Sequence, residues 1–399
     1  MRFRVLDAWR GIAALLVALF HLNVSSAIYG LDFIRNAYLF VDFFFVLSGF
    51  VITHSYAERL RTLEDVGAFA TRRFNRLWPL HVVVLFAFVL VELAKLFAEA
   101  RGAAFSVPAF ADATSAATLP LNLVFAHSFG IVRHLTWNPP SWSIAVEFWT
   151  YLIFAAVLYV SAARFASHRF AAEALLLLLL AASVAILVSY SDRGQDVTYD
   201  LGLFRCLYGF LVGHFVYRLW QVCPRELFET RLLEIAVLII AVYYVATTGR
   251  SGYGFFAPLV FGAIVLVFAF EAGPISKLMS NRTNDWLGRI SYSIYMWQAF
   301  IIFNLVDRPV SVVEKITQMV LTTTDGAGSA LGGEAGKLIV LGDHVLPILA
   351  TLLFLGALVG VASVSYRLIE RPSAADRKSL THPQQNLLRD FRSKAALES

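Results

Sequence analysis

Apolar stretches of roughly 17–25 residues follow one another along this chain, separated by polar connections. An α-helix needs about 20 consecutive apolar residues to cross the hydrocarbon core of a bilayer. Ten stretches of this kind stand at residues 10–30, 38–56, 77–97, 142–161, 171–190, 201–219, 232–248, 254–270, 290–306 and 346–369. The pattern predicts an all-α polytopic integral membrane protein with about ten transmembrane helices. The apolar stretch 119–129 is too short to span and predicts an interfacial or re-entrant helix.

The composition agrees with a membrane protein. Hydrophobic residues make up 58% of the chain and charged residues only 15%, whereas soluble chains average about 45–50% and 25%. The net charge of +5 does not indicate nucleic-acid binding, because the basic residues are spread through short loops. The two cysteines, Cys206 and Cys223, indicate neither a disulfide framework nor a metal site.

The positions of Lys and Arg predict the orientation. With the N-terminus inside, 23 of the 33 basic residues fall in inside segments and 8 in outside loops. Because cytoplasmic loops accumulate Lys and Arg, we expect both termini in the cytoplasm, in a multi-pass protein of the cell (plasma or inner) membrane. The first segment also resembles a secretory signal peptide, but the many later spans favour an uncleaved helix.

The chain divides into a membrane domain, 1–372, and a cytosolic basic tail, 373–399. Before the last span, the Gly-, Thr- and Ser-rich segment 310–343 is expected to be a mobile outside loop.

The first apolar stretch carries a polar stripe. Arg10 and His21 are eleven residues apart, which is about three turns, so they share a face and lie roughly 16 Å apart along the axis. A polar stripe of this kind faces protein or a water-filled cavity rather than lipid. A signal-anchor helix, with Arg10 at its cytosolic end and His21 bonding a neighbouring helix, is the alternative.

A cluster of arginines precedes the third stretch. Arg73 and Arg76 are three residues apart and share a helical face, and Arg72 flanks them. The planar guanidinium fork suits phosphate groups. On composition alone an ordinary positive-inside cluster is the simpler interpretation, but the position at the foot of a span, on the same side as Arg10, favours a function.

Glu147 lies one to two turns inside the fourth stretch. An isolated carboxylate at that depth costs several kcal/mol, so Glu147 is a candidate functional residue. Trp142 and Trp149 flank it and fit an interfacial aromatic belt.

Two further charges lie near the outer ends of spans. Asp42 is costly there unless it is paired, solvated or capping a helix. Arg205 can pair with Glu147, Asp200 or an anionic substrate, and a purely structural ion pair is the alternative.

The last two stretches carry polar residues as well. Tyr292, Tyr295 and Gln298 follow one another at intervals of three, which suits hydrogen bonds between helices. Glu370 and Arg371 either close the last helix as a local ion pair or let Glu370 clamp the arginines of the first inside loop.

In this order, the segments resemble the membrane acyltransferase-3 family over nearly the whole chain, from Arg10 to Pro372. The resemblance rests on Arg10-x10-His21, VDFFFVLSGFVI, Arg73-x-x-Arg76, WSIAVE, LGRISYSIYMW and YRLIERP. It implies transfer of an acyl group, commonly acetyl from acetyl-CoA, to a hydroxyl of a carbohydrate or similar acceptor. Gln298 stands where many members have a histidine. No large esterase-like domain follows the last span, so we expect a stand-alone transferase unit.

The resemblance implies catalytic roles. It makes His21 the catalytic histidine, Arg10 its partner and Glu147 an essential acid. A neutral imidazole can deprotonate the acceptor hydroxyl, or it can accept the acyl group and pass it on. Glu147 is expected to orient the ring or stabilise the imidazolium.

The resemblance also makes Arg73 and Arg76 donor-side residues. We expect acyl-CoA to act as a co-substrate rather than a bound cofactor and to approach from the cytosol. Its phosphates meet Arg73, Arg76 and Arg72, and its pantetheine arm threads between helices toward His21.

The acceptor, such as a cell-surface or exported polysaccharide or a glycolipid, is expected to enter from the outer side. Asp42, Trp142 and Arg205 are assigned to that side, and homo-oligomers are a further expectation. A secondary transporter that uses His21 and Glu147 as a proton relay is the competing class. Transporters often show paired repeats and matched broken helices, and the sequence shows neither.

Overall fold

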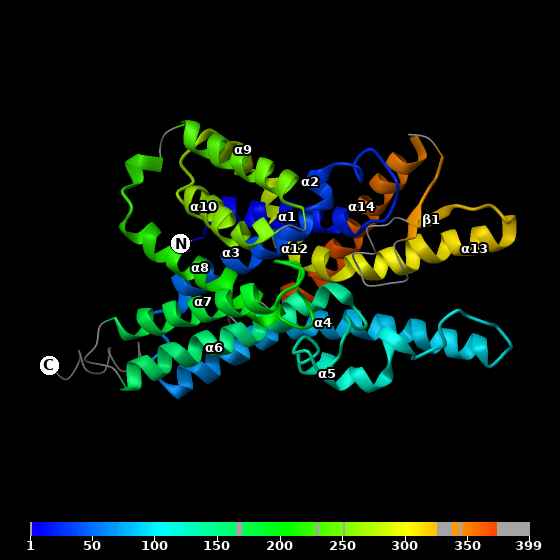
Figure 1. The fold of residues 1–399 in the computed structure, drawn as a ribbon, viewed down its shortest axis with the longest axis horizontal. Coiled ribbons are helices and arrows are strands. Elements are labelled where there is room, and N and C mark those ends of the chain that lie inside the picture. The colour runs from blue at the N-terminus through cyan, green and yellow to red at the C-terminus, as the bar shows by residue number, and fades with distance from the viewer. Residues whose placement is uncertain are drawn as a thin grey trace, which may run out of the picture.

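The computed structural model describes residues 2–164, 170–228, 231–249, 252–324, 337–342 and 345–372. Within these residues the chain is a bundle of long helices, with α4, α6 and α7 along one side of it (Figure 1). The tail at 373–399 lies outside the described residues, so its assignment stays a prediction.

A helix stands at each of the ten apolar stretches. These helices are α1 (Arg4–His21), α3 (Phe40–Tyr56), α4 (Leu63–Glu99), α6 (Trp142–Arg164), α7 (Ala171–Tyr190), α8 (Gly202–Val222), α9 (Arg231–Thr248), α10 (Ala257–Ala269), α12 (Arg282–Ile301) and α14 (Val345–Ser365). Among the described residues, six helical segments are both long and apolar enough to cross a membrane. The all-α class and a multi-pass membrane protein therefore follow, while the count of ten stays a prediction.

Shorter elements join the long helices. They are α2 (Asp32–Arg35), α5 (Leu119–Leu123), α11 (Pro274–Met279), α13 (Arg308–Thr317), the π-helical turns η7 (Ile302–Asp307) and η8 (Tyr366–Glu370), and 3-10 turns at 37–39, 112–114, 116–118, 139–141, 225–228 and 252–256. The short stretch at 119–129 begins with α5, whose Asn122 is fully buried.

The segment 310–343, expected to be a mobile outside loop, contains a helix and two strands at its described ends. The chain continues from α12 through η7 into α13, and then strands β1 (Thr322–Thr324) and β2 (Lys337–Ile339) pair antiparallel, with Thr322 opposite Ile339. Ile339 also exchanges backbone hydrogen bonds with the segment just after α1, donating to Asn23 O (2.8 Å) and accepting from Ser25 N (2.8 Å). Composition alone could not show this backbone pairing.

Helix α4 is longer than its apolar stretch. It begins at a capping box, in which the Thr62 hydroxyl accepts from the backbone of Asp65 and the Asp65 carboxylate accepts from the backbone of Thr62. It then runs for 37 residues, with Pro79 inside it. The first inside segment, between the apolar stretches 38–56 and 77–97, is therefore mostly helix, and Arg72, Arg73 and Arg76 stand on α4.

Glycines let two pairs of helices approach closely. A Cβ at Gly288 of α12 would overlap the carbonyl oxygen of Asp7, and a Cβ at Gly11 of α1 would meet Leu287. Similarly, a Cβ at Gly49 of α3 would overlap the carbonyl oxygen of Phe210 on α8. Gly49 is therefore a point of close approach between α3 and α8.

Contacts between distant segments agree with the predicted alternation of sides. At one end of the bundle Arg4 pairs with Asp285 (2.5 Å) and Arg76 with Glu370 (3.5 Å). The Arg4 guanidinium lowers the pKa of the Asp285 carboxyl below its ordinary value through their hydrogen bond. All four residues belong to segments expected inside, but the side that faces the cytosol stays a prediction.

Candidate functional site

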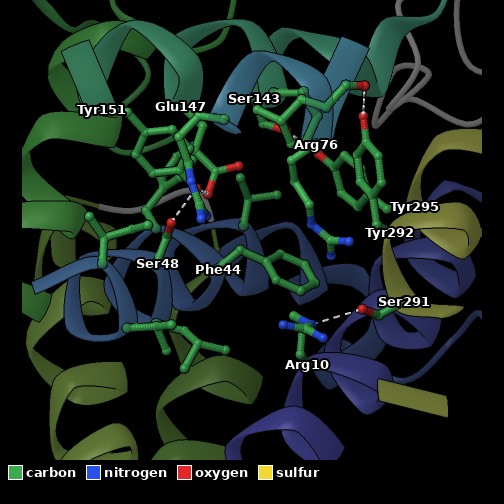
Figure 2. Close-up of a pocket in the computed structure, with 18 residues that line it drawn as sticks. Arg10, Phe44, Ser48, Arg76, Ser143, Glu147, Tyr151, Ser291, Tyr292 and Tyr295 are labelled. Atoms are coloured by element: carbon green, nitrogen blue, oxygen red, sulfur yellow. Dashed lines mark hydrogen bonds between the residues drawn. The ribbon is translucent and has the colours of Figure 1, made fainter. Parts of the chain in front are cut away.

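A cavity of about 170 Å³ lies between α1, α3, α4, α6 and α12. Its wall carries three arginines, one carboxylate and a set of hydroxyl groups, on a lining of Phe, Leu, Ile and Val (Figure 2). Charged groups of this number inside a helix bundle point to a polar ligand, because charges at such depth are costly without one.

Arg10 enters the cavity from α1. Its Nε donates to Ser291 Oγ (2.9 Å), and its Nη2 donates to the Gly288 carbonyl (2.7 Å) and pairs with Asp7 (3.2 Å). The close packing of α1 on Gly288 makes the second bond possible. Arg10 is thereby fixed in place with its charge only partly balanced.

Arg76 enters from α4 on the opposite side of the cavity (Figure 2). Its Nη1 lies 3.5 Å from the Glu370 carboxylate, which also accepts from Ser293 Oγ (2.5 Å). Of the two interpretations of Glu370, this contact favours the clamp on the first inside segment, through Arg76, over a local ion pair with Arg371. Glu370 orients Arg76 from behind and lines no part of the cavity itself.

Arg73 lies among aromatic rings. Its Nη2 donates to the Tyr56 hydroxyl (3.3 Å), and its guanidinium carbon is 5.3 Å from the Tyr56 ring centre and 5.9 Å from that of Tyr151. Its Nε is buried without a hydrogen-bond partner among the described residues. Arg72 lies over the Tyr56 ring (5.5 Å) and does not line the cavity.

Glu147 is the acid of the cavity. Its Oε1 accepts a short hydrogen bond from the Tyr151 hydroxyl (2.5 Å), one turn further along α6, and that hydroxyl also bonds Ser48 Oγ (2.7 Å) (Figure 2). Both Arg73 and Arg76 act on it electrostatically. Glu147 thus balances the arginines across the cavity.

The polar stripe on α12 joins three neighbouring helices. The Tyr292 hydroxyl donates to the Leu77 carbonyl of α4 (2.7 Å), the Tyr295 hydroxyl bonds Ser143 Oγ of α6 (2.8 Å), and Gln298 faces His21 of α1. The predicted hydrogen bonding between helices is confirmed. It also forms one wall of the cavity, since Tyr292 and Tyr295 line it.

His21 does not line the cavity. Its Nδ1 lies 3.2 Å from Gln298 Oε1, and the Gln298 amide is oriented by its own donation to the Tyr295 carbonyl (3.0 Å). An amide oxygen only accepts, so Nδ1 carries a proton in this contact, and in the neutral ring Nε2 then keeps its lone pair. The imidazole is therefore held in the tautomer that can act as a base through Nε2.

The expected contact between Glu147 and His21 is not present. Among the residues that the structure describes, no hydrogen bond or ion pair joins them, and His21 is oriented by Gln298 instead. The reason is geometric: Glu147 turns toward Tyr151 and Ser48, while His21 lies at the far end of α1. A neutral amide thus takes the orienting position assigned to the acid.

Asp42 and Arg205 form a buried ion pair. Arg205 Nη2 lies 2.8 Å and Nε 3.1 Å from the Asp42 carboxylate, Gln195 also donates to Asp42 (2.9 Å), and Arg205 donates to the Tyr38 carbonyl (3.3 Å). Sequence patterns had suggested Glu147 or Asp200 as partners for Arg205. Asp42 was recognised only as an acid that needs a partner.

Trp142 packs beside this pair, with the Arg205 guanidinium 5.5 Å from its ring centre, and is only 6% exposed. The expectation that Trp142 belongs to an interfacial belt is wrong, because the close approach of Gly202 encloses the ring. The assignment of Asp42, Trp142 and Arg205 to the acceptor side stays a prediction.

Comparison with known proteins decides the family. The model of the family described as "Acyltransferase domain" (Acyl_transf_3) matches residues 3–367. The chain belongs to the acyltransferase-3 family. The expected resemblance is confirmed.

Among curated proteins, the chain is 29% identical over 322 residues to "Peptidoglycan O-acetyltransferase OatA" of Listeria monocytogenes, covering 74% of this chain and 49% of that protein. It is 25% identical over 319 residues to "O-acetyltransferase OatA" of Staphylococcus aureus, covering 74% and 50%. The chain spans about half the length of these relatives. The comparison with solved structures gave no match.

Four polar residues that line the cavity were not singled out as site residues: Ser48, Ser143, Tyr151 and Ser291. Tyr151 stands four residues after Glu147, a spacing that places both on one face of α6, so this contact was visible in principle. Ser48 and Ser143 gave no comparable signal, because an isolated serine in an apolar run is compatible with simple packing.

Proposed function

We propose that the protein is an integral membrane O-acyltransferase that moves an acyl group, most simply acetyl, from acyl-CoA to a carbohydrate hydroxyl. The observation that carries the proposal is the cavity in which Arg10, Arg73 and Arg76 converge within a family of acyltransferases. CoA carries several phosphate charges, and guanidinium groups bind phosphate through paired hydrogen bonds.

The donor binds at this cavity from the cytosolic side in the proposal. Arg10 and Arg76 face each other across the space (Figure 2), and Arg73 Nε has no hydrogen-bond partner among the residues that the structure describes. Arg72 contributes charge from outside the cavity. Tyr56 and Tyr151 limit the freedom of Arg73, which lowers the entropy cost of binding.

The acyl end of the donor then reaches toward His21. Tyr295 lines the cavity, and Gln298, which holds His21, is three residues further along α12, a rise of about 4.5 Å. The pantetheine arm therefore follows α12 from the arginines to the histidine, past Phe44, whose ring is 5.7 Å from that of Tyr295.

Two routes of transfer fit this arrangement. In the first, His21 Nε2 takes the proton of the acceptor hydroxyl, the oxygen attacks the thioester carbonyl, and the C–S bond breaks to release CoA thiolate. In the second, Nε2 attacks the carbonyl itself and CoA thiolate leaves; the acceptor hydroxyl then takes the acyl group from the imidazole, and its proton passes to the freed Nε2. Glu147 acts in both by balancing the arginines that hold the donor.

The acceptor enters from the opposite side of the membrane in this account. The names of the relatives favour a glycan of the peptidoglycan class as acceptor. Asp42 and Arg205 serve that side by holding α3 against α8, because their charges are already used in the ion pair, and Trp142 of α6 packs against Arg205. The charge bias favours termini in the cytoplasm, and homo-oligomers stay an expectation.

A proton-coupled transporter is the less favoured function. It needs proton exchange between His21 and Glu147, and within the described part of the chain no bond connects the two. No feature of the cavity favours transport over transfer.

The donor site is tested by steady-state kinetics of purified protein in lipid nanodiscs with acetyl-CoA and a peptidoglycan-derived glycan. Changing Arg73 and Arg76 to Ala should raise the donor KM about tenfold or more, because charged hydrogen bonds are lost, with little change in the acceptor KM. Lys at both positions should restore only part of the affinity. Arg59 and Arg61, which lie before α4 and away from the cavity, are the matched control pair. An unchanged donor KM in the Arg73 and Arg76 variant would return this pair to a role in topology.

A further inference from the structure

A second basic site lies on the far side of α12. A groove of about 350 Å³ is lined by Trp286 and Arg289 of α12 and by Ser363, Tyr366, Arg367 and Arg371 on α14, η8 and the residue that follows it. It shares no residue with the cavity described above. The two sites back onto each other, since Ser291 and Tyr292 of α12 face the cavity while Trp286 and Arg289 face the groove.

The arginines of the groove are exposed and have no carboxylate partner within the described residues. The two acids nearest to them in the sequence are already engaged: Asp285, one turn before Arg289, pairs with Arg4 (2.5 Å), and Glu370 pairs with Arg76 (3.5 Å). Three guanidinium groups that form no ion pair within the described part of the chain surround one groove and make a site for a phosphate group.

The surroundings of the groove are those of a membrane boundary. Trp286 and Tyr366 are aromatic residues of the type that gathers at the bilayer interface. On the same helical run as the arginines, Leu368 is 71% and Val364 is 57% exposed, as expected of side chains that face lipid. A ligand that fits must therefore offer a phosphate to the groove and apolar chains to the helix surface beside it.

We propose that this groove binds the headgroup of an anionic phospholipid, with its phosphate on Arg289, Arg367 and Arg371 and its acyl chains along α14. Basic pockets between transmembrane helices are known to take such headgroups. The site is separate from the proposed donor cavity, so it can fail without affecting the proposed function, and the reverse is also true.

Native mass spectrometry of the full chain from nanodiscs tests this site. The nanodiscs contain equal parts of phosphatidylglycerol and phosphatidylcholine, and the lipid retained by the protein is counted. We expect the wild-type protein to retain phosphatidylglycerol in preference to phosphatidylcholine. In R289Q/R367Q the ratio of retained phosphatidylglycerol to phosphatidylcholine should fall by roughly thirtyfold. R59Q/R282Q, which removes two exposed arginines outside the groove, should keep the preference.

Three results would overturn the proposal. The first is that R289Q/R367Q retains as much phosphatidylglycerol as the wild-type protein. The second is that the wild-type protein retains phosphatidylglycerol and phosphatidylcholine in equal amounts. In a third arm, inorganic phosphate at millimolar concentration can displace the retained lipid completely, which would make the groove a free-phosphate site. Equal thermal midpoints of the two double variants in phosphatidylcholine alone show that any lost preference is not a loss of fold.

Discussion

Glu147 shows how the cavity works at the scale of single residues. It is the only carboxylate that lines the described cavity, and it faces the arginines while Tyr151 holds its oxygen (2.5 Å). A neutral amide of the same shape would leave the charges of Arg73 and Arg76 less balanced and the Tyr151 hydroxyl with a weaker acceptor.

Changing Glu147 to Gln should therefore lower the rate of transfer by about tenfold or more, while donor binding survives. The measurement is kcat together with the Kd of CoA for the same preparation. Tyr151→Phe is the matched control, because it removes the hydrogen bond and keeps the charge, and its loss should be smaller. Wild-type kcat in the Glu147 variant would show that this acid has no part in the reaction.

At the residue scale, charge type and helical spacing could be predicted, but partner choice could not. Arg10, Arg73, Arg76 and Glu147 were all recognisable as charges on or next to apolar helices, and they do meet in one cavity. Pairing of Arg76 with Glu370 and of Arg205 with Asp42 depends on which helices are neighbours. Which helices are neighbours is a property of the whole bundle and cannot be predicted from the spacing of residues along one helix.

Helices α1 and α12 illustrate the scale of elements. Their contact rests on Gly11 and Gly288, and it brings the Arg10 guanidinium to the Gly288 carbonyl (2.7 Å). The glycines are visible in the sequence, but an apolar helix has many faces, and only the structure shows which glycine meets which partner. The length of α4 is a similar case, since its polar first turns are helical because of the Thr62 and Asp65 capping box.

Changing Gly288 to Ala should destabilise the protein by about 1–3 kcal/mol, because the added Cβ overlaps the Asp7 carbonyl and forces α1 and α12 apart. The displacement of Arg10 should also weaken donor binding. Gly356→Ala and Gly360→Ala on α14 are the matched controls, since a Cβ at either position meets open space. Thermal unfolding in detergent measures the effect, and an unchanged midpoint for Gly288→Ala would mean that the two helices are not in tight contact.

At the scale of the whole molecule, the all-α class and the positions of the long helices could be predicted from the hydrophobic pattern. A helix lies at every stretch, but six segments of the described chain reach the length and hydropathy of a span by themselves. Of the other four, α1 and α12 carry polar residues that face the cavity rather than lipid, whereas α8 and α9 contribute no residue to it. Hydropathy therefore underestimates the helices that carry the chemistry.

The predicted orientation follows from the charge bias and has a direct test. Reporter fusions at Asp65, Asp192, Glu226 and Gly326 should read inside, outside, inside and outside. A reporter at Glu226 that reads outside would contradict the topology and would place the arginine cavity on the wrong side for a cytosolic donor.

The central claim is that the histidine at the end of α1 carries out acyl transfer from a donor held by the arginines. Its most direct test is transfer from radiolabelled acetyl-CoA to a glycan by purified protein, wild type against His21→Ala, with CoA binding measured on the same samples. The account predicts a rate lower by about 100-fold or more, because the base or nucleophile is lost, with CoA affinity and fold retained. Label that stays on the quenched wild-type protein and is absent from the variant would identify the covalent route. If the His21 variant folds, binds CoA and transfers acetyl at the wild-type rate, the account is contradicted.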